Sequence, residues 1–150
     1  MVTVFVYGTL KPGEAAYRRY CQPHVVLAQP ALVRGDLFHL PQGYPALTVG
    51  DRWIQGFLLK LHNDWDITAM DEFEDYDPSR SAAENLYVRQ QWPVLSPTQQ
   101  PLGQAWVYWM ARHRIQALGG VAVTSGNWSR QYWPSLAPLE PTDDTDLEAR

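Results

Sequence analysis

The chain begins with VTVFVYGTLKPG, residues 2–13, in which a run of apolar residues leads into a loop bounded by two glycines. The first six residues form two interleaved sets, with Val2, Val4 and Val6 in one and Thr3, Phe5 and Tyr7 in the other. Successive side chains of a strand point to opposite faces, so both faces of this strand are largely apolar. The pattern predicts an interior strand that is buried on both sides and ends at Gly8.

The loop that follows this strand has the features of an anion-binding turn. Gly8 lets backbone N–H groups turn outward without a Cβ in the way, and a row of such donors can hold a carboxylate or an oxyanion. The alternative is an ordinary connection between a strand and a helix. Gly8 and Gly13 are spaced as in a P-loop, but Glu14 and Ala15 stand where that motif requires a lysine and a hydroxyl residue. The sequence therefore argues against nucleotide binding.

A second informative stretch is acidic and lies near the middle of the chain. Its spacing predicts a helix over Asp64–Phe73 that ends before Pro78. On this helix Asp71 and Glu72 fall on the polar side, whereas Glu74 falls at the border of the apolar side. Partial burial raises the pKa of a carboxyl group toward the range useful for proton transfer, which makes Glu74 the candidate acid or base. The alternative is that Glu74 lies in a frayed, solvent-exposed end.

Three motifs follow one another in the chain: Tyr7-Gly8-Thr9-Leu10, Asp71-Glu72-Phe73-Glu74-Asp75-Tyr76, and a strand from Tyr87 through Arg89 to Val94. Together they resemble the gamma-glutamylcyclotransferase-like family. Members of that family carry Tyr-Gly-Ser/Thr-Leu, Asp-x-x-Glu-Gly-Tyr and Tyr-x-Arg-x-x-x-x-Val in this order. The resemblance covers residues 2–111. Asp75 departs from the pattern, because the family has glycine there, and it adds a negative charge beside Glu74.

The resemblance implies an α+β fold with a small, mixed and strongly curved β-sheet or barrel and a few short helices. It implies an enzyme that releases 5-oxoproline from a small γ-glutamyl substrate by intramolecular attack of the substrate's amine, with no cofactor. Glu74 would be the general acid and base. The binding residues would be Tyr7, Gly8, Thr9, Leu10 and Tyr87.

Other functions stay open at this stage. The departure at Asp75 leaves room for a non-catalytic domain of the same fold that binds a small molecule or a partner. A related cyclotransferase could act on γ-glutamylamines or on an aminoacyl carrier. A hydrolase that uses Glu72 and Glu74 as a carboxylate pair is disfavoured, because residues two apart on a helix point about 200° apart.

Composition fits one compact domain, which we place at residues 1–137, followed by an acidic, disordered tail at 138–150. The chain has 150 residues, a net charge of −4 and scattered basic residues, so nucleic acid is not an expected partner. No apolar run is long enough to span a membrane, and the start lacks the pattern of a signal peptide. A single cysteine, Cys21, fits a cytoplasmic location and is expected to be buried and unreactive. The four histidines show no metal-ligand spacing, and no feature indicates an oligomeric state.

Hydrophobic periodicity predicts the remaining elements. They are a helix at 14–21, strands at 31–40, 52–61, 86–95 and 103–111, a turn at 42–45 and a hairpin loop at 96–101. In the loop at 119–128, Trp128 either packs on the core or covers a pocket.

Overall fold

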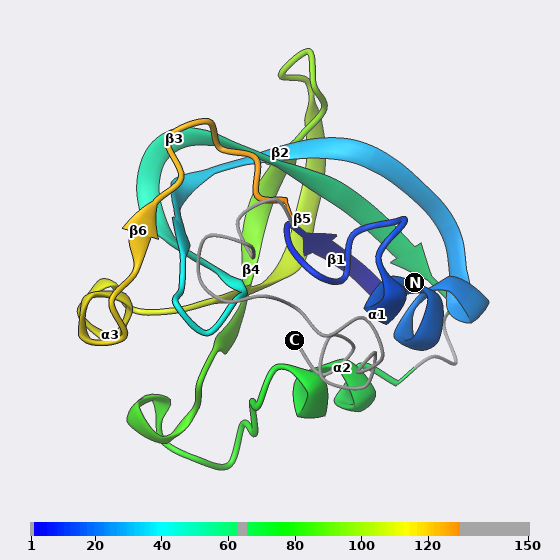
Figure 1. Cartoon of the computed structure of the whole chain (residues 1–150). Coiled ribbons are helices and arrows are strands. Elements are labelled where there is room, and N and C mark those ends of the chain that lie inside the picture. Colours follow the sequence, from blue (N-terminus) through cyan, green and yellow to red (C-terminus); the bar gives the residue numbers. More distant parts are fainter. Residues whose placement is uncertain (1, 63–65, 130–150) are drawn as a thin grey trace.

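The computed structural model describes residues 2–62 and 66–129, and its elements follow one another as labelled in Figure 1. The strands are β1 (Val2–Val6), β2 (Val25–His39), β3 (Pro45–Leu61), β4 (Val88–Leu95), β5 (Pro101–Trp109) and β6 (Val121–Ala122). The helices are α1 (Ala15–Tyr20), α2 (Thr68–Phe73) and α3 (Arg112–Ala117), with short 3-10 turns η1 (Gln22–His24) and η2 (Ala82–Glu84).

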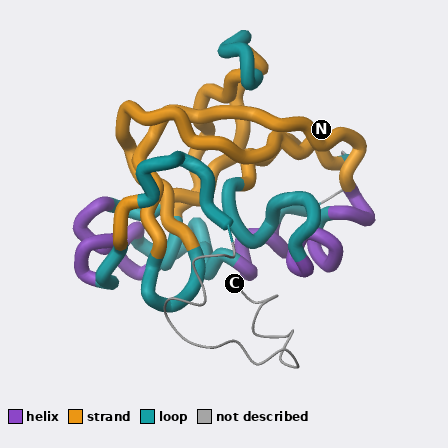
Figure 2. Tube along the Cα trace, turned by 45° about the horizontal axis from the view of Figure 1, so that its top comes forward, coloured by secondary structure: helices purple, strands orange, loops and turns teal. Residues whose placement is uncertain are grey.

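The six strands form one mixed sheet that closes on itself. The strand order is β3-β1-β5-β4-β2-β6, and β2 also pairs with β3, so the first five strands complete a ring. The β1–β5 pairing is parallel and the other pairings are antiparallel. Figure 2 shows the helices gathered to one side of the strands. The predicted α+β class with a strongly curved, mixed sheet is confirmed.

Strand β1 is one of the strands of this ring and pairs with β3 along one edge and with β5 along the other. Val4 and Val6 belong to one cluster of buried residues, whereas Phe5 and Tyr7 belong to a second cluster on the opposite face. All four side chains are at most 7% exposed. The alternation of two apolar sets therefore does produce a strand that is buried on both sides.

Strands β2 and β3 are longer than predicted because they bend rather than end. β2 begins six residues before the predicted start at 31, and β3 begins at Pro45 rather than at 52. The pairing passes from Gly35–Arg52 directly to Asp36–Thr48, so residues 49–51 form an irregularity within one continuous hairpin. Gly50 and Asp51 give this segment the composition of a turn, which hides the strand on either side of it.

The start of helix α2 also differs from the prediction. Helix α2 begins at Thr68, where the backbone N–H donates to Oδ1 of Asp66 over 3.0 Å. The first residues of the predicted helix, Asp64 and Trp65, lie outside the described residues, as do the predicted tail at 138–150 and the domain boundary at 137. Helix α3 and strand β6 were not predicted. None of the helices within the described ranges has the length and apolar character needed to cross a membrane.

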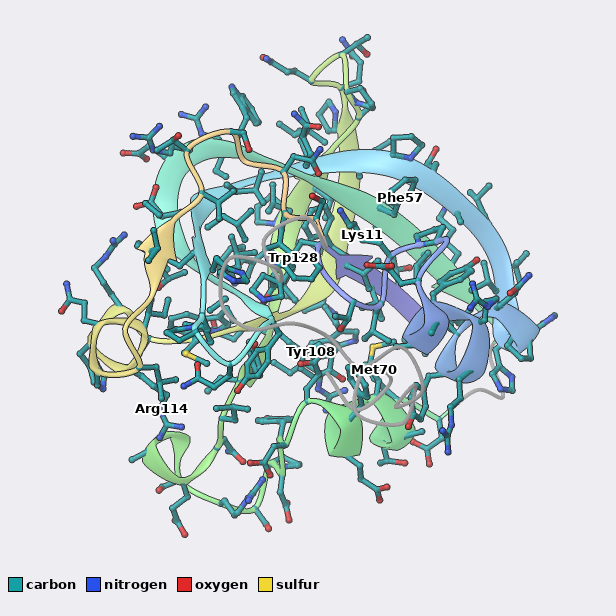
Figure 3. The ribbon with its side chains drawn as sticks, viewed as in Figure 1. Lys11, Phe57, Met70, Tyr108, Arg114 and Trp128 are labelled. Carbon is teal, nitrogen blue, oxygen red and sulfur yellow. The ribbon has the colours of Figure 1, made fainter. Side chains whose placement is uncertain are left out.

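Trp128 packs on the core, which is one of the two roles expected for it. Its side chain is fully buried, and its Nε1 donates to Nδ1 of His39, on β2, over 3.0 Å. Its backbone carbonyl accepts a hydrogen bond from Nζ of Lys11 over 2.5 Å. Figure 3 shows Lys11 and Trp128 side by side in front of the barrel. These two bonds attach residues 127–129 both to the end of β2 and to the loop after β1.

Candidate active site

A narrow pocket opens where β1 ends, and all six residues predicted to form the site line it. The cavity volume is about 30 Å³, room for roughly two water molecules. Its walls come from the end of β1 and the following loop, the start of β3, the end of α2, the start of β4 and β5. The lining residues are Phe5, Val6, Tyr7, Gly8, Thr9, Leu10, Tyr44, Pro45, Phe73, Glu74, Tyr87 and Tyr108.

The loop after β1 is a tight turn closed by the N–H of Lys11, which donates to the carbonyl of Gly8 over 3.0 Å. Within residues 2–62 and 66–129, no hydrogen bond is formed by the N–H groups of Gly8, Thr9 or Leu10. A Cβ on Gly8 would lie 2.5 Å from Cγ of Pro45. Glycine is therefore needed because the Pro45 ring packs against the backbone. A left-handed backbone angle is not the reason, because Gly8 is not among the residues with a positive φ.

Glu74 directly follows the last residue of α2, and its half-buried side chain reaches this pocket. Glu72, on the same helix, is exposed. Burial raises the pKa of both the Tyr7 hydroxyl and the Cys21 thiol. The charge of Glu74 is the second cause, and it raises both values further. Glu74 therefore lies close to the end of β1 as well as to α1. The expected position of Glu74 at the border of the apolar face matches the structure.

Three tyrosine hydroxyls at the pocket each donate to a protein oxygen. Tyr7 donates to the carbonyl of Tyr108 over 2.5 Å, and Tyr87 donates to the carbonyl of Pro45 over 2.6 Å. Tyr108 donates to Oδ1 of Asp71 over 2.6 Å. These bonds tie β1, β3, β5 and α2 together around the cavity.

Asp71 does not lie on a polar face as predicted, because its side chain is buried and only 4% of the residue is exposed. Arg89 and Tyr108 are directly paired across β4 and β5, so their side chains share one face of the sheet. Helix α2 covers this face and places Oδ1 of Asp71 3.4 Å from Nε of Arg89. Burial raises the pKa of Asp71, while Tyr108 and Arg89 act in the opposite direction. The spacing of residues along the helix shows only which of them share a side of the helix. It does not show which side a sheet covers, so the sequence analysis missed this contact.

Asp75 does not add its charge to the pocket, contrary to the expectation. Its carboxylate lies 3.3 Å from the guanidinium of Arg80 and is half exposed. With Asp71 and Glu72 it lines a separate surface depression whose lining does not include Glu74. The residue has a φ of 53°, a left-handed angle at which glycine is the least strained residue. The glycine of the family motif thus corresponds to a backbone requirement that aspartate meets here.

The described residues show no metal-ligand cluster, and the one cysteine among them is buried. Across the described ranges, no group of three or more His, Cys, Asp or Glu residues is arranged to hold a metal. Cys21 is fully buried, and burial together with the charge of Glu74 raises its pKa to about 12. The site instead combines one carboxylate, a row of backbone donors and fixed tyrosines.

Comparison with protein families gives a match over most of the chain. A family model described as gamma-glutamyl cyclotransferase, AIG2-like, matches residues 4–130. A curated relative from Niallia circulans, gamma-L-glutamyl-butirosin B gamma-glutamyl cyclotransferase, is 29% identical over 108 residues. That match covers 72% of this chain and 67% of the relative.

Solved structures show the same fold at low sequence identity. An AIG2-like protein from Mus musculus has a TM-score of 0.67 and 20% identity, over 95% of this chain and 98% of that one. YkqA from Bacillus subtilis has a TM-score of 0.60 and 22% identity, over 89% of this chain. This chain spans only 42% of the length of YkqA.

Proposed function

Because this chain belongs to the gamma-glutamyl cyclotransferase, AIG2-like family, we propose that it is an enzyme that releases 5-oxoproline from a γ-glutamyl compound. The α-amine of the γ-glutamyl group attacks the γ-carbonyl carbon and forms a new C–N bond. The original C–N bond to the amine or amino acid breaks, and that group leaves with one added proton. Ring closure within one molecule supplies a proximity advantage that can reach ~7–11 kcal/mol, so modest assistance from the protein is enough.

Glu74 is proposed to move the protons. It takes one from the substrate's α-ammonium group, which frees the attacking lone pair, and gives it to the leaving nitrogen. The attacking nitrogen loses its second proton to solvent as the ring closes. The observation that supports this role is its position. Among the described residues that line the pocket, Glu74 is the sole carboxylate, and it lies at the end of β1 where the loop offers its N–H groups.

The loop is proposed to bind the negative charge of the substrate. The N–H groups of Gly8, Thr9 and Leu10 have no described protein acceptor, and N–H groups of this kind stabilise a carboxylate or the oxyanion that develops during attack. Tyr7 and Tyr87 form the walls beside this loop. The cavity has room for only about two water molecules, so its walls must move apart to admit the γ-glutamyl group. The name of the relative from Niallia circulans contains gamma-L-glutamyl-butirosin B, and we include this compound among the candidate substrates.

The decisive experiment is incubation of the purified protein with a panel of γ-glutamyl compounds and detection of 5-oxoproline by mass spectrometry. We expect release from at least one compound, and we expect Glu74→Gln to lower kcat by about 10²–10⁴-fold, the usual contribution of a general acid or base. Glu72→Gln is the matched control, because Glu72 lies on the same helix but is exposed. Activity that survives in Glu74→Gln and disappears in Glu72→Gln would refute the assignment. Binding of γ-glutamyl compounds without any turnover would instead favour a non-catalytic domain.

A further inference from the structure

Tyr108 lines the pocket, and its hydroxyl proton is already used in a hydrogen bond within the protein. A phenol has one proton to donate and can also accept, and the proton of Tyr108 goes to Asp71 over 2.6 Å. Burial, followed by the neighbouring carboxylates, raises the pKa of Tyr108 far above its usual range, so the hydroxyl stays protonated. The oxygen of Tyr108 therefore offers the pocket an acceptor and not a donor.

The direction of this bond is fixed by the elements behind it. An ionised carboxylate only accepts hydrogen bonds, and the guanidinium of Arg89, 3.4 Å from Oδ1 of Asp71, favours the ionised form. Arg89 is itself held over the ring of Trp106, 4.5 Å from its centroid. Figure 3 shows Tyr108 and Met70 together where the sheet meets α2. The orientation of the Tyr108 hydroxyl is thus set by groups that do not line the pocket.

Glu74 and Tyr108 line the same pocket, and the charge of Glu74 is among the causes that raise the pKa of Tyr108. The same pocket thus combines a carboxylate and a tyrosine with the N–H groups of Gly8, Thr9 and Leu10. Acceptors and donors in one pocket match the ammonium and the carboxylate of a free α-amino acid head group.

We propose that Tyr108, oriented by Asp71 and Arg89, accepts a hydrogen bond from the α-ammonium group of the substrate and directs that group to Glu74. The proposal rests on the proposed function and adds to it the residue that binds the α-ammonium group. Compounds that lack this group, such as glutarate, should gain nothing from Tyr108. Asp71 and Arg89 are positioning residues that act through Tyr108.

The test compares two ligands that differ only in the α-amino group, L-glutamate and glutarate, neither of which carries a leaving amine. Dissociation constants from protein-detected NMR titrations are compared for the unmodified protein, Tyr108→Phe and Tyr76→Phe. Tyr76→Phe is the matched control, because its ring packs edge-on against Tyr108, with centroids 6.5 Å apart, without lining the pocket. Tyr108→Phe should weaken glutamate binding by about tenfold or more, the usual weight of a hydrogen bond to a charged group, and leave glutarate binding unchanged. Tyr76→Phe should change neither.

Asp71→Asn supplies a second variant in case the loss of the hydroxyl disturbs folding. An asparagine has an acceptor oxygen and a donor amide, so the direction of its bond with Tyr108 is no longer fixed, and this variant should show a smaller loss that is again selective for glutamate. Equal losses for both ligands, no loss for glutamate, or no binding of either ligand to the unmodified protein would each overturn the proposal. Failure of the proposed function has a different signature. In that case no 5-oxoproline is released from any γ-glutamyl compound, while the selectivity for glutamate still depends on Tyr108.

Discussion

Asp75 is the residue at which this chain departs from the family motif, and its backbone explains what the position demands. With φ at 53°, it connects the end of α2 to the following loop, and its carbonyl accepts hydrogen bonds from Leu86 and Arg80. A residue with a Cβ pays roughly 1–2 kcal/mol in this conformation, and aspartate is among the residues that tolerate it best. The position therefore limits which side chains can follow Glu74.

Substitutions at Asp75 should separate this backbone effect from the charge. We expect Asp75→Ala to lower stability by about 1 kcal/mol, because alanine keeps the Cβ and has no polar group to compensate. Asp75→Gly should be close to neutral, since relief of strain is offset by greater freedom of the unfolded chain. Urea denaturation of both variants measures the difference. Equal stabilities for alanine and glycine would show that the left-handed angle is not the constraint.

Cys21 provides a chemical probe of the same region. A thiol with a pKa of about 12 is almost wholly protonated at pH 8, and the side chain is fully buried. We expect the native protein to react with a thiol reagent at least 100-fold more slowly than the urea-unfolded chain, because the thiolate is the reactive form. Fast labelling of the native protein would show that α1 opens readily and that the environment inferred for Cys21 is wrong.

The sequence predicted the residues of the site that belong to local motifs, and it missed those that depend on tertiary contacts. The loop after β1 and Glu74 each lie within a short stretch whose pattern identifies them. The Asp71–Tyr108 bond joins residues 37 positions apart and depends on the pairing of β4 with β5. The arginine of the third motif was the available signal for this contact, because a charged side chain that becomes buried needs a partner.

At the scale of elements, the attachment of residues 127–129 depends on the protonation of one histidine. Only neutral His39 can accept from Trp128 through Nδ1 while it keeps its other proton, and burial lowers the pKa of His39. Because the folded-state pKa lies below the unfolded value, the unfolded chain takes up more protons as the pH falls. The stabilisation from neutral His39 is complete above pH ~6.5 and is lost as the pH falls toward the folded-state pKa.

The replacement of His39 by a group that does not titrate tests this linkage. His39→Asn keeps an oxygen acceptor near the position of Nδ1, so we expect its Tm to fall less between pH 7.5 and 5.5 than that of the unmodified protein. Thermal melts followed by tryptophan fluorescence give both values. Parallel pH dependences in the two proteins would mean that His39 does not control the attachment of Trp128.

The strength of the sequence prediction also varied with the element. The strand at the start of the chain was predicted correctly, because β1 has two largely apolar faces and Thr3 is its one polar residue. Helix α3 was missed because Arg112–Ala117 contains few apolar residues, of which Ile115 alone is buried. A single anchoring residue gives no periodicity from which a helix can be predicted.

At the scale of the molecule, the barrel is closed within the described residues, and the last eleven residues of the chain should add nothing to its stability. Their composition, rich in Asp, Glu and Thr, cannot bury enough apolar area to offset the entropy of ordering. We expect removal of residues 140–150 to leave Tm and 5-oxoproline release unchanged. A fall of several degrees on truncation would show that Leu147 packs on the barrel.

The position of β1 has a consequence for how the chain is made. This strand is synthesised first, yet its two neighbours are β3, which ends at Leu61, and β5, whose Trp106 pairs with Val4. About 45 residues separate Leu61 from Trp106, and their synthesis takes roughly 2–9 s. During that interval a nascent chain holds an apolar strand with one open edge, a template for pairing with other chains. A ribosome that pauses within β4 would prolong this exposure, so the speed of synthesis across residues 61–106 bears directly on the yield of folded protein.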